Sequence, residues 1–262
     1  MKVKDKKIIV TGAGNGIGRE LVLELLKRGA TVAALDMNKE TLSETRDLAN
    51  SDKLFTYEVN ITDDQGLEAF KLRVMNEMGD IDGIINNAGI IQPFVHVDQL
   101  AMNDINRVMD VNFYGPLKLI KMFLPSLLNR PEAHIVNVSS MGGFFPFPGQ
   151  TVYGASKAAL KIFTEGMYAE LLDTSVRVTI VFPGAIATNI TKNSGVEMST
   201  TGDTKMKMTS PSSAALQIIN GMEKDAFQVY VGSDAKMMNM MYKLSPKRAI
   251  KFINKMMAGM NK

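Results

Sequence analysis

The start of the chain combines a strand, a glycine-rich turn and a helix. The apolar run Ile8–Val10 leads into four glycines between positions 12 and 18, and a helical pattern follows over Ile17–Arg28. Glycine lets the backbone turn tightly and approach a ligand, and a helix that begins there points free N–H groups at it. This order predicts a pyrophosphate site at the first strand of a parallel α/β sheet. The alternative is a turn that binds nothing.

Strand and helix patterns alternate along the whole chain. The expected strands are Lys7–Gly12, Thr31–Asp36, Leu54–Asn60, Gly83–Asn87, His134–Ser140, Arg177–Pro183 and Phe227–Gly232. The expected helices are Ile17–Arg28, Lys39–Ala49, Asp63–Met78, Ala101–Leu128, Tyr153–Leu172 and Ser212–Glu223. Continuous apolar runs are typical of strands buried on both faces. We expect an α/β fold with a Rossmann-type, doubly wound parallel sheet of about seven strands and helices on both faces.

Composition excludes several kinds of site. The chain of 262 residues has no cysteine, which excludes disulfides, thiolate metal sites and cysteine nucleophiles. Its two histidines, His96 and His134, are too few for a zinc triad, so no metal is expected. A net charge of +3 does not indicate a nucleic-acid partner. Without a secretory leader or a membrane-spanning run, the expected location is the cytoplasm.

Tyr153 and Lys157 lie four residues apart at the start of an expected helix, so their side chains share one face. A tyrosine is a poor base near neutral pH, but a neighbouring ammonium group lowers its pKa and suits it to general acid–base work. Any amphipathic helix can carry this spacing by chance. Ser140 ends the fifth strand and should reach the same crevice, where its hydroxyl can hydrogen-bond a substrate oxygen. It lacks the glycine-flanked turn of a nucleophilic serine.

Asp36 ends the second expected strand, where a carboxylate can accept hydrogen bonds from the adenosine ribose. The same carboxylate opposes a 2′-phosphate, since two unit charges ~4 Å apart repel by about 4 kcal/mol at an effective dielectric constant near 20. Met37 and Asn38 bring no compensating charge, and Lys39 is the nearest basic residue. Asp36 therefore predicts NAD as the cofactor rather than NADP. The alternative is a solvated loop residue or a helix cap.

Together these features resemble the short-chain dehydrogenase/reductase family over about residues 5–190. The matching motifs are Thr11-Gly12-x-x-x-Gly16-Ile17-Gly18, Asn86-Asn87-Ala88-Gly89, Asn112 within Val-Asn-Phe-Tyr-Gly, Ser140 and Tyr153 placed 13 residues apart, Lys157, and Pro183-Gly184-Ala-Ile186-Ala-Thr188. The resemblance implies a catalytic tetrad. Ser140 would hold the substrate oxygen and Tyr153 would exchange a proton with it. Lys157 would bind the nicotinamide ribose and lower the pKa of Tyr153, while Asn112 would position a water molecule linking Lys157 to solvent.

The resemblance also implies the cofactor contacts. They are Thr11, Gly12, Asn15, Gly16, Ile17, Gly18, Asp36, Asn60, Ile61, Asn87, Ala88, Gly89, Tyr153, Lys157, Pro183, Gly184, Ile186 and Thr188. Family members commonly have aspartate where this chain has Asn60, but an asparagine oxygen can still accept from the adenine amino group. By the same resemblance, helix 153–172 would carry the interface of a homodimer or homotetramer.

The substrate side is expected to be apolar. The expected pocket residues are Phe94, Ser140, Gly142, Phe144, Phe147, Gln150 and Met198. Residues 191–211 lack a clear period and are expected to form a mobile lid after the sixth strand. The pattern favours an apolar alcohol or ketone as substrate. The alternative is that the aromatic residues pack the core or a subunit interface.

Residues 233–262 form an extension to the domain of residues 1–232. From residue 235 onward the extension has 7 basic residues and no acidic one, and its apolar residues have helical spacing (Ile250, Ile253, Met257 and Met260). Such a helix could dock on the protein or a neighbouring subunit, lie on an anionic membrane, or stay disordered.

For the whole chain we expect the function of an NAD-dependent dehydrogenase or reductase. The alternative is an NAD(H)-binding scaffold or sensor, at a membrane or not, with little turnover.

Overall fold

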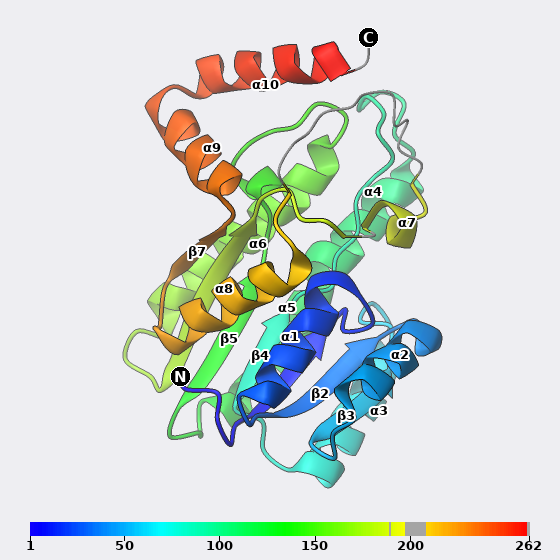
Figure 1. Cartoon of the computed structure of the whole chain (residues 1–262), viewed down its shortest axis with the longest axis vertical. Helices are drawn as coiled ribbons and strands as arrows, with labels where there is room; N and C mark the ends of the chain where they lie inside the picture. Colours follow the sequence, from blue (N-terminus) through cyan, green and yellow to red (C-terminus); the bar gives the residue numbers. More distant parts are fainter. Residues whose placement is uncertain (189, 197–207, 261–262) are drawn as a thin grey trace.

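Seven parallel strands form one sheet with the order β3-β2-β1-β4-β5-β6-β7 in the computed structural model (Figure 1). The strands are β1 (Lys7–Thr11), β2 (Thr31–Asp36), β3 (Leu54–Glu58), β4 (Gly83–Asn86), β5 (Ala133–Val138), β6 (Val176–Pro183) and β7 (Gln228–Val231). The structure describes residues 1–188, 190–196 and 208–260, with side chains through residue 255 in the last range. The doubly wound parallel sheet expected from the sequence is confirmed. Its strand order changes direction between β1 and β4, which opens a crevice at their carboxyl ends.

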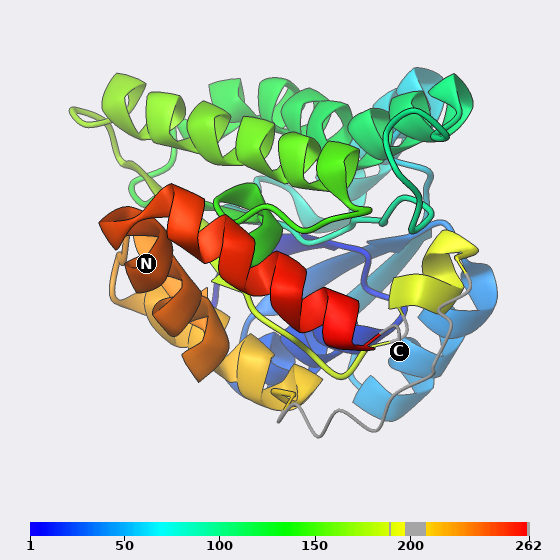
Figure 2. The same ribbon diagram turned by 90° about the horizontal axis from the view of Figure 1, so that it is seen from above.

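Helices cover both faces of the sheet. They are α1 (Gly16–Lys27), α2 (Lys39–Ala49), α3 (Asp64–Met78), α4 (Met102–Met109), α5 (Gly115–Leu127), α6 (Thr151–Glu170), α7 (Ile190–Ser194), α8 (Pro211–Glu223), α9 (Ser233–Leu244) and α10 (Pro246–Met260). Seen from above, α5 and α6 form a layer on one side of the sheet, and α1 and α8 lie on the other (Figure 2).

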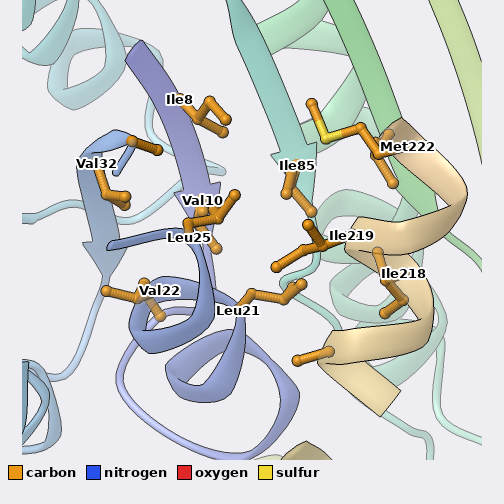
Figure 3. Close-up of a cluster of buried hydrophobic side chains, with 14 of the residues drawn as sticks. Ile8, Val10, Leu21, Val22, Leu25, Val32, Ile85, Ile218, Ile219 and Met222 are labelled. Atoms are coloured by element: carbon orange, nitrogen blue, oxygen red, sulfur yellow. The ribbon is translucent and has the colours of Figure 1, made fainter. Parts of the chain in front are cut away.

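Each face of the sheet has its own apolar core. Ile8 and Val10 of β1 point toward α1 and α8, where they meet Leu25 and Ile219 (Figure 3). Ile9, between them in sequence, belongs to the opposite cluster with side chains of α3, α5 and α6. Successive side chains of a strand point to opposite faces, so a strand that is apolar throughout can contribute to both cores. The continuous apolar runs in the sequence are explained by this double burial.

The helix expected over residues 101–128 is divided by a short π-helix, η1 (Asp110–Tyr114). Pro116 follows η1 and has no N–H group to donate to the carbonyl of Asn112, four residues earlier. A wider π turn adjusts the backbone there, and such turns are frequent at functional sites. Helical backbone is nevertheless continuous over residues 102–127, so the predicted helix is present and the π turn within it is what the sequence pattern did not predict.

The C-terminal helices pack across the carboxyl end of the sheet, and α10 lies over this end between the two helix layers (Figure 2). Ala249 and Ile253 of α10 are buried against Met141, Phe145 and Met238. Of the expected apolar stripe, Ile253 thus docks on the protein itself whereas Ile250 is exposed, and the side chains of Met257 and Met260 lie outside the described residues. None of the helices that the structure describes is long and apolar enough to span a membrane.

Candidate active site

The carboxyl ends of the central strands border a cavity of about 1030 Å³. Most of the cofactor contacts implied by the sequence motifs line it, namely Gly12, Asn15, Gly16, Ile17, Asp36, Asn60, Ile61, Asn87, Ala88, Gly89, Tyr153, Lys157, Pro183, Gly184, Ile186 and Thr188. Thr11 and Gly18 do not line the cavity: the Thr11 hydroxyl accepts from the Ala88 N–H group, and Gly18 lies against the Gly12 carbonyl oxygen. With Val138, Ser139 and Ser140, which also line the cavity, the structure brings segments from the ends of β1 to β6 to one crevice.

Thr11 and Asn87 join the glycine turn to the segment after β4. The Thr11 hydroxyl accepts hydrogen bonds from the backbone N–H groups of Asn87 (3.1 Å) and Ala88 (3.0 Å). In return, the Asn87 amide donates to the Thr11 carbonyl oxygen (3.0 Å). Gly12 and Gly16 have φ angles of +66° and +53°, a left-handed conformation that disfavours other residues. The backbone of the turn is thus fixed at close range to the cavity.

The first turn of α1 is available to an anion. Asn15 is its N-cap residue, but the Asn15 side chain makes no capping hydrogen bond to the helix. The Asn15 Oδ1 instead accepts from the Asn193 side chain (2.8 Å). N–H groups at a helix N-terminus and the positive end of the helix dipole favour a negative ligand. The turn lined by Gly16 and Ile17 therefore fits a pyrophosphate.

Asp36 lies at the far end of the same cavity. Its Oδ2 accepts from the backbone N–H of Gly14 (2.8 Å) and its Oδ1 from that of Asn38 (2.9 Å). Its neighbour Met37 is 69% exposed and also lines the cavity. The two hydrogen bonds fix the carboxylate beside the glycine turn, where it places negative charge at the cavity.

Asn60 and Ile61 line the cavity beyond β3. The Asn60 Oδ1 accepts hydrogen bonds from the backbone N–H (3.1 Å) and the hydroxyl (2.9 Å) of Thr62. These local bonds occupy the oxygen expected to face an adenine amino group. Ile61 is buried against Gly115, where any added side-chain atom would overlap it.

Ser140 and Tyr153 meet at the centre of the crevice, and both line the cavity. Gly142 lies between them, since a Cβ atom on this residue would be 3.2 Å from the Tyr153 ring and 3.5 Å from the Ser140 Oγ. The Ser140 Oγ also accepts from the Gly142 backbone N–H (3.0 Å). Burial raises the pKa of the Tyr153 phenol above its usual value, and the nearby Ser140 side chain acts in the opposite direction. The tyrosine is therefore neutral at physiological pH.

Lys157 is 3% exposed and lines the same cavity. Its Nζ donates to the carbonyl oxygen of Val138 at the end of β5 (3.0 Å). Burial lowers the pKa of Lys157 to about 8. The phenol and the ammonium group thus converge as the helical spacing predicted, but burial, rather than the charge of Lys157, determines the direction in which the pKa of Tyr153 moves.

Asn112 lies in η1 and is fully buried behind the cavity. Its side chain accepts from the Ile90 N–H (2.9 Å) and donates to the Ile90 carbonyl oxygen (2.9 Å) and the Ser156 hydroxyl (3.0 Å). A Cβ atom on Gly89 would lie 3.0 Å from the Lys157 Nζ and 3.2 Å from the Asn112 Oδ1. Asn112 therefore joins the loop after β4 to α6 next to Lys157, and Gly89 leaves the space between them open.

Comparison with known proteins identifies the family to which this fold belongs. A family model described as short chain dehydrogenase matches residues 6–199. The chain belongs to the short-chain dehydrogenase/reductase family. It is an oxidoreductase of this family, whose members bind NAD or NADP.

Relatives of this short-chain dehydrogenase/reductase extend over most of its length. The chain is 34% identical over 250 residues to the SadH protein of Mycobacterium tuberculosis, an alignment that covers 91% of this chain and 90% of SadH. A short-chain dehydrogenase from Streptomyces avermitilis has a similar structure, with a TM-score of 0.83, 25% identity and 98% of each chain covered. Another, from Burkholderia cenocepacia in complex with NADP, has a TM-score of 0.80 and 28% identity over 97% of this chain and 99% of its own.

The aromatic residues expected around the substrate lie mostly elsewhere in this dehydrogenase. Phe144 packs on the rings of Phe182 and Tyr230, with centroid separations of 5.3 and 5.9 Å, and Phe147 packs on Phe145 at 5.6 Å. Phe145 belongs to the apolar cluster beneath α9 and α10, and Phe144 and Phe147 pack against this cluster. Neither Phe144 nor Phe147 lines the cavity. Phe144 and Phe147 therefore pack against the core, as the alternative interpretation of the sequence predicted. The C-terminal helices provide the apolar surface for this packing.

Only some of the other residues expected in the substrate pocket lie at the cavity. Ser140 lines the cavity and Gly142 touches Tyr153, whereas Phe94 is 43% exposed and is not part of the lining. Gln150 is buried at the start of α6, where its Nε2 donates to the Gln92 carbonyl oxygen (2.8 Å). Met198 lies outside the described residues.

The sequence patterns gave no indication of a set of contacts made by α7. The Ser194 hydroxyl accepts from the Ile91 N–H (2.9 Å), and the Ser194 carbonyl oxygen accepts from the Arg107 guanidinium (3.1 Å). With the bond between Asn193 and Asn15, these contacts link α7 to three walls of the cavity. The polar, aperiodic run after Thr188 carries no signal for a helix here. Residues 197–207 of the expected lid lie outside the described residues.

Proposed function

We propose that the chain transfers a hydride between NAD(H) and an apolar secondary alcohol or ketone. The observation that carries this proposal is the convergence of the Ser140 hydroxyl, the Tyr153 phenol and the Lys157 ammonium group on the cavity that the glycine turn also borders. When bound, a nicotinamide dinucleotide would supply the hydride chemistry.

The residues of the cavity fit such a dinucleotide. The uncapped first turn of α1 suits the pyrophosphate, and Gly12 and Gly16 leave room for a close approach. Asp36 suits the adenosine ribose, and Lys157 suits the ribose on the nicotinamide side.

The protein's own groups supply the proton and the orientation. Ser140 would hold the substrate oxygen beside the Tyr153 hydroxyl. In ketone reduction the phenol would give its proton to the substrate oxygen, and in alcohol oxidation it would take a proton back. Because burial raises the pKa of Tyr153, the phenol carries its proton at neutral pH, the form that reduction needs. Lys157 would stabilise the phenolate left after the transfer.

The apolar substrate class is supported by the cavity wall rather than by the phenylalanines. Ile90 and Ile91 follow β4, Ile190 begins α7 after β6, and all three line the cavity. A wall of branched aliphatic side chains excludes water and favours an aliphatic or alicyclic carbonyl compound over a sugar. Family members bind NAD or NADP, and Asp36 is the residue that we expect to favour NAD in this chain.

Asp36→Ala is expected to weaken the preference for NADH over NADPH by about 10- to 100-fold, because it removes the carboxylate that repels a 2′-phosphate. The measurement is a fluorescence titration of both reduced cofactors with the wild type and the variant. Asp52→Ala removes an exposed carboxylate from the loop before β3 and serves as the control. An unchanged ratio of the two dissociation constants in Asp36→Ala would rule out Asp36 as the determinant.

The function itself is tested by turnover. The purified protein is first titrated with NADH and NADPH, and nicotinamide absorbance is then followed across a panel of apolar secondary alcohols and ketones. We expect tight NADH binding together with turnover of at least one member. Tight binding without turnover across the panel would contradict the enzymatic proposal and favour an NAD(H)-binding scaffold or sensor.

A further inference from the structure

Gln92 lies in the loop after β4 with its side chain fully buried against the start of α6. Its Oε1 accepts hydrogen bonds from the backbone N–H groups of Val152 (2.8 Å) and Tyr153 (2.9 Å). Its Nε2 donates to the Gly149 carbonyl oxygen (3.0 Å), and its own carbonyl oxygen accepts from Gln150 (2.8 Å). All four bonds join Gln92 to four residues that lead into and begin α6, namely Gly149, Gln150, Val152 and Tyr153.

These bonds replace the usual cap of a helix. The first N–H groups of a helix have no partner within it, and the side chain of the N-cap residue normally accepts from the second or third of them. In α6 the N-cap residue is Gln150, whose side chain makes no such bond. Val152 and Tyr153 occupy the second and third positions of α6. Gln92, distant in sequence, therefore caps the helix turn that carries the catalytic tyrosine.

We propose that Gln92 is a positioning residue that fixes the Tyr153 hydroxyl relative to Ser140. Ser140 follows β5 whereas Tyr153 belongs to α6, so their separation depends on how the start of α6 is held to the rest of the fold. Gln92 holds it through the N–H group of Tyr153 itself. Because a displacement of about 1 Å in a reacting group can cost 10²-fold in rate, loss of this cap should be visible in catalysis.

Two variants separate positioning from general stability. Gln92→Leu removes both the acceptor and the donor, and we expect kcat to fall about 10- to 100-fold with the NADH dissociation constant changed less than about threefold. Gln92→Glu keeps an acceptor oxygen and adds negative charge near the phenol. We expect it to retain more activity than Gln92→Leu and to shift the pH–rate profile toward higher pH, because the charge disfavours the phenolate. Gln99→Leu, at an exposed site of the same loop, is the matched control.

A second readout does not depend on activity. Hydrogen exchange of the amides in residues 150–157 should be faster in Gln92→Leu than in the wild type and unchanged in Gln99→Leu. The kinetic part of this proposal rests on the proposed function, but hydrogen exchange tests the cap even if no substrate turns over. Unaltered exchange would overturn the cap. Faster exchange with kcat and the pH profile unchanged in both Gln92 variants would overturn the positioning role.

A separate observation concerns the exposed side of the C-terminal helices. Opposite its buried face, α9 exposes Met237, Met240 and Leu244, which are 46%, 61% and 81% exposed and lie along one stripe of the helix. The basic residues of α9 and α10 with described side chains are Lys236, Lys243, Lys247, Arg248, Lys251 and Lys255. Asp234 is the one acidic residue of the segment 233–262, and its carboxylate accepts from the Ala185 N–H (2.6 Å). The exposed side chains of α9 and α10 thus include both apolar and basic groups.

We propose that this surface, formed by α9 and the outer face of α10, binds anionic phospholipid bilayers. Exposed methionine and leucine side chains can enter the headgroup region, and lysines beside them are attracted to negative lipid. A symmetric contact with a second copy of the chain would bring two sets of like charges together, which disfavours that occupant. An anionic membrane complements both the charge and the apolar stripe.

Co-sedimentation with vesicles tests the surface. We expect the protein to pellet with vesicles of phosphatidylcholine and phosphatidylserine at low salt, at least tenfold more than with phosphatidylcholine alone, and to dissociate as salt rises. Lys243→Glu/Lys247→Glu/Lys251→Glu should abolish pelleting and Met240→Ser/Leu244→Ser should reduce it, whereas Lys4→Glu/Lys121→Glu should not. No pelleting at low salt would overturn the proposal. A lower molar mass of Met240→Ser/Leu244→Ser in light scattering would overturn it in favour of a subunit interface.

Discussion

Tyr153→Phe is expected to lower kcat for ketone reduction by about 10²–10⁴-fold, the usual contribution of a positioned general acid. The substitution removes the hydroxyl that faces Ser140 and leaves the ring that packs against Gly142. The dissociation constant for NADH and the melting temperature should therefore change little. The measurement is steady-state turnover of the best substrate in the panel, with NADH titration and thermal denaturation of the same preparation.

Tyr168→Phe provides a matched control for this substitution. Tyr168 lies on the same helix, is 38% exposed and packs on Phe227 at a centroid separation of 4.3 Å, far from the cavity. The same loss of a hydroxyl there should leave kcat unchanged. Wild-type turnover in Tyr153→Phe would show that another group supplies the proton and would contradict the assigned role.

Gly18→Ala is expected to have the largest effect on folding and cofactor binding together. A Cβ atom on Gly18 would overlap the Gly12 carbonyl oxygen and lie 2.7 Å from the Asn87 side-chain nitrogen. Both neighbours belong to the joint between the glycine turn and the segment after β4, so the turn must move. Overpacking of this kind costs about 1–3 kcal/mol, which for a chain of this size lowers the melting temperature by roughly 2–12 °C. The dissociation constant for NADH should rise more than about tenfold, because the N–H groups of the turn lose their alignment.

Gly166→Ala distinguishes this overlap from a general effect of glycine replacement. Gly166 lies inside α6, and nothing lies within 4 Å of the Cβ atom that alanine would add. Alanine in a helix interior is favoured over glycine by roughly 0.5–1 kcal/mol, so this variant should be slightly more stable than the wild type. Equal melting temperatures and NADH affinities for Gly18→Ala and Gly166→Ala would contradict the close approach at the turn.

The sequence was most informative where one physical requirement determines the residue type. Strands buried on both faces must be apolar throughout, so the strand positions could be predicted within a few residues. The glycine turn has to approach a ligand, and Tyr153 and Lys157 have to share a helix face, so the sequence alone predicts that these residues meet at one crevice. In the structure the glycine turn, Tyr153 and Lys157 do border one cavity.

Other features depend on contacts between distant segments and could not be predicted from spacing. An aromatic run after a strand can line a pocket or pack a core, and for Phe144 and Phe147 the apolar face that α9 and α10 provide decides between the two. The π-helix at Asn112 needs a backbone rearrangement that a helical pattern does not encode. Gln92 caps α6 from another loop, so its role is invisible in the sequence around Tyr153.

The pKa of Tyr153 is a further property that sequence spacing alone could not predict. Spacing along α6 predicted a neighbouring ammonium group and hence a lowered pKa, but burial of the phenol acts in the opposite direction and dominates in the folded protein. Desolvation depends on everything packed around a group, whereas a local motif contains only its sequence neighbours.

The most direct test of the central claim follows the hydride itself. NADH in which both hydrogens at the reactive carbon of the nicotinamide ring are deuterium would be incubated with the enzyme and an apolar ketone, and the alcohol product analysed by mass spectrometry and NMR. We predict one deuterium on the carbinol carbon of the product with the wild type, and at least a hundredfold slower labelling with Tyr153→Phe. Product without deuterium at that carbon, or equal labelling rates in the two proteins, would contradict hydride transfer at this site with Tyr153 as the acid.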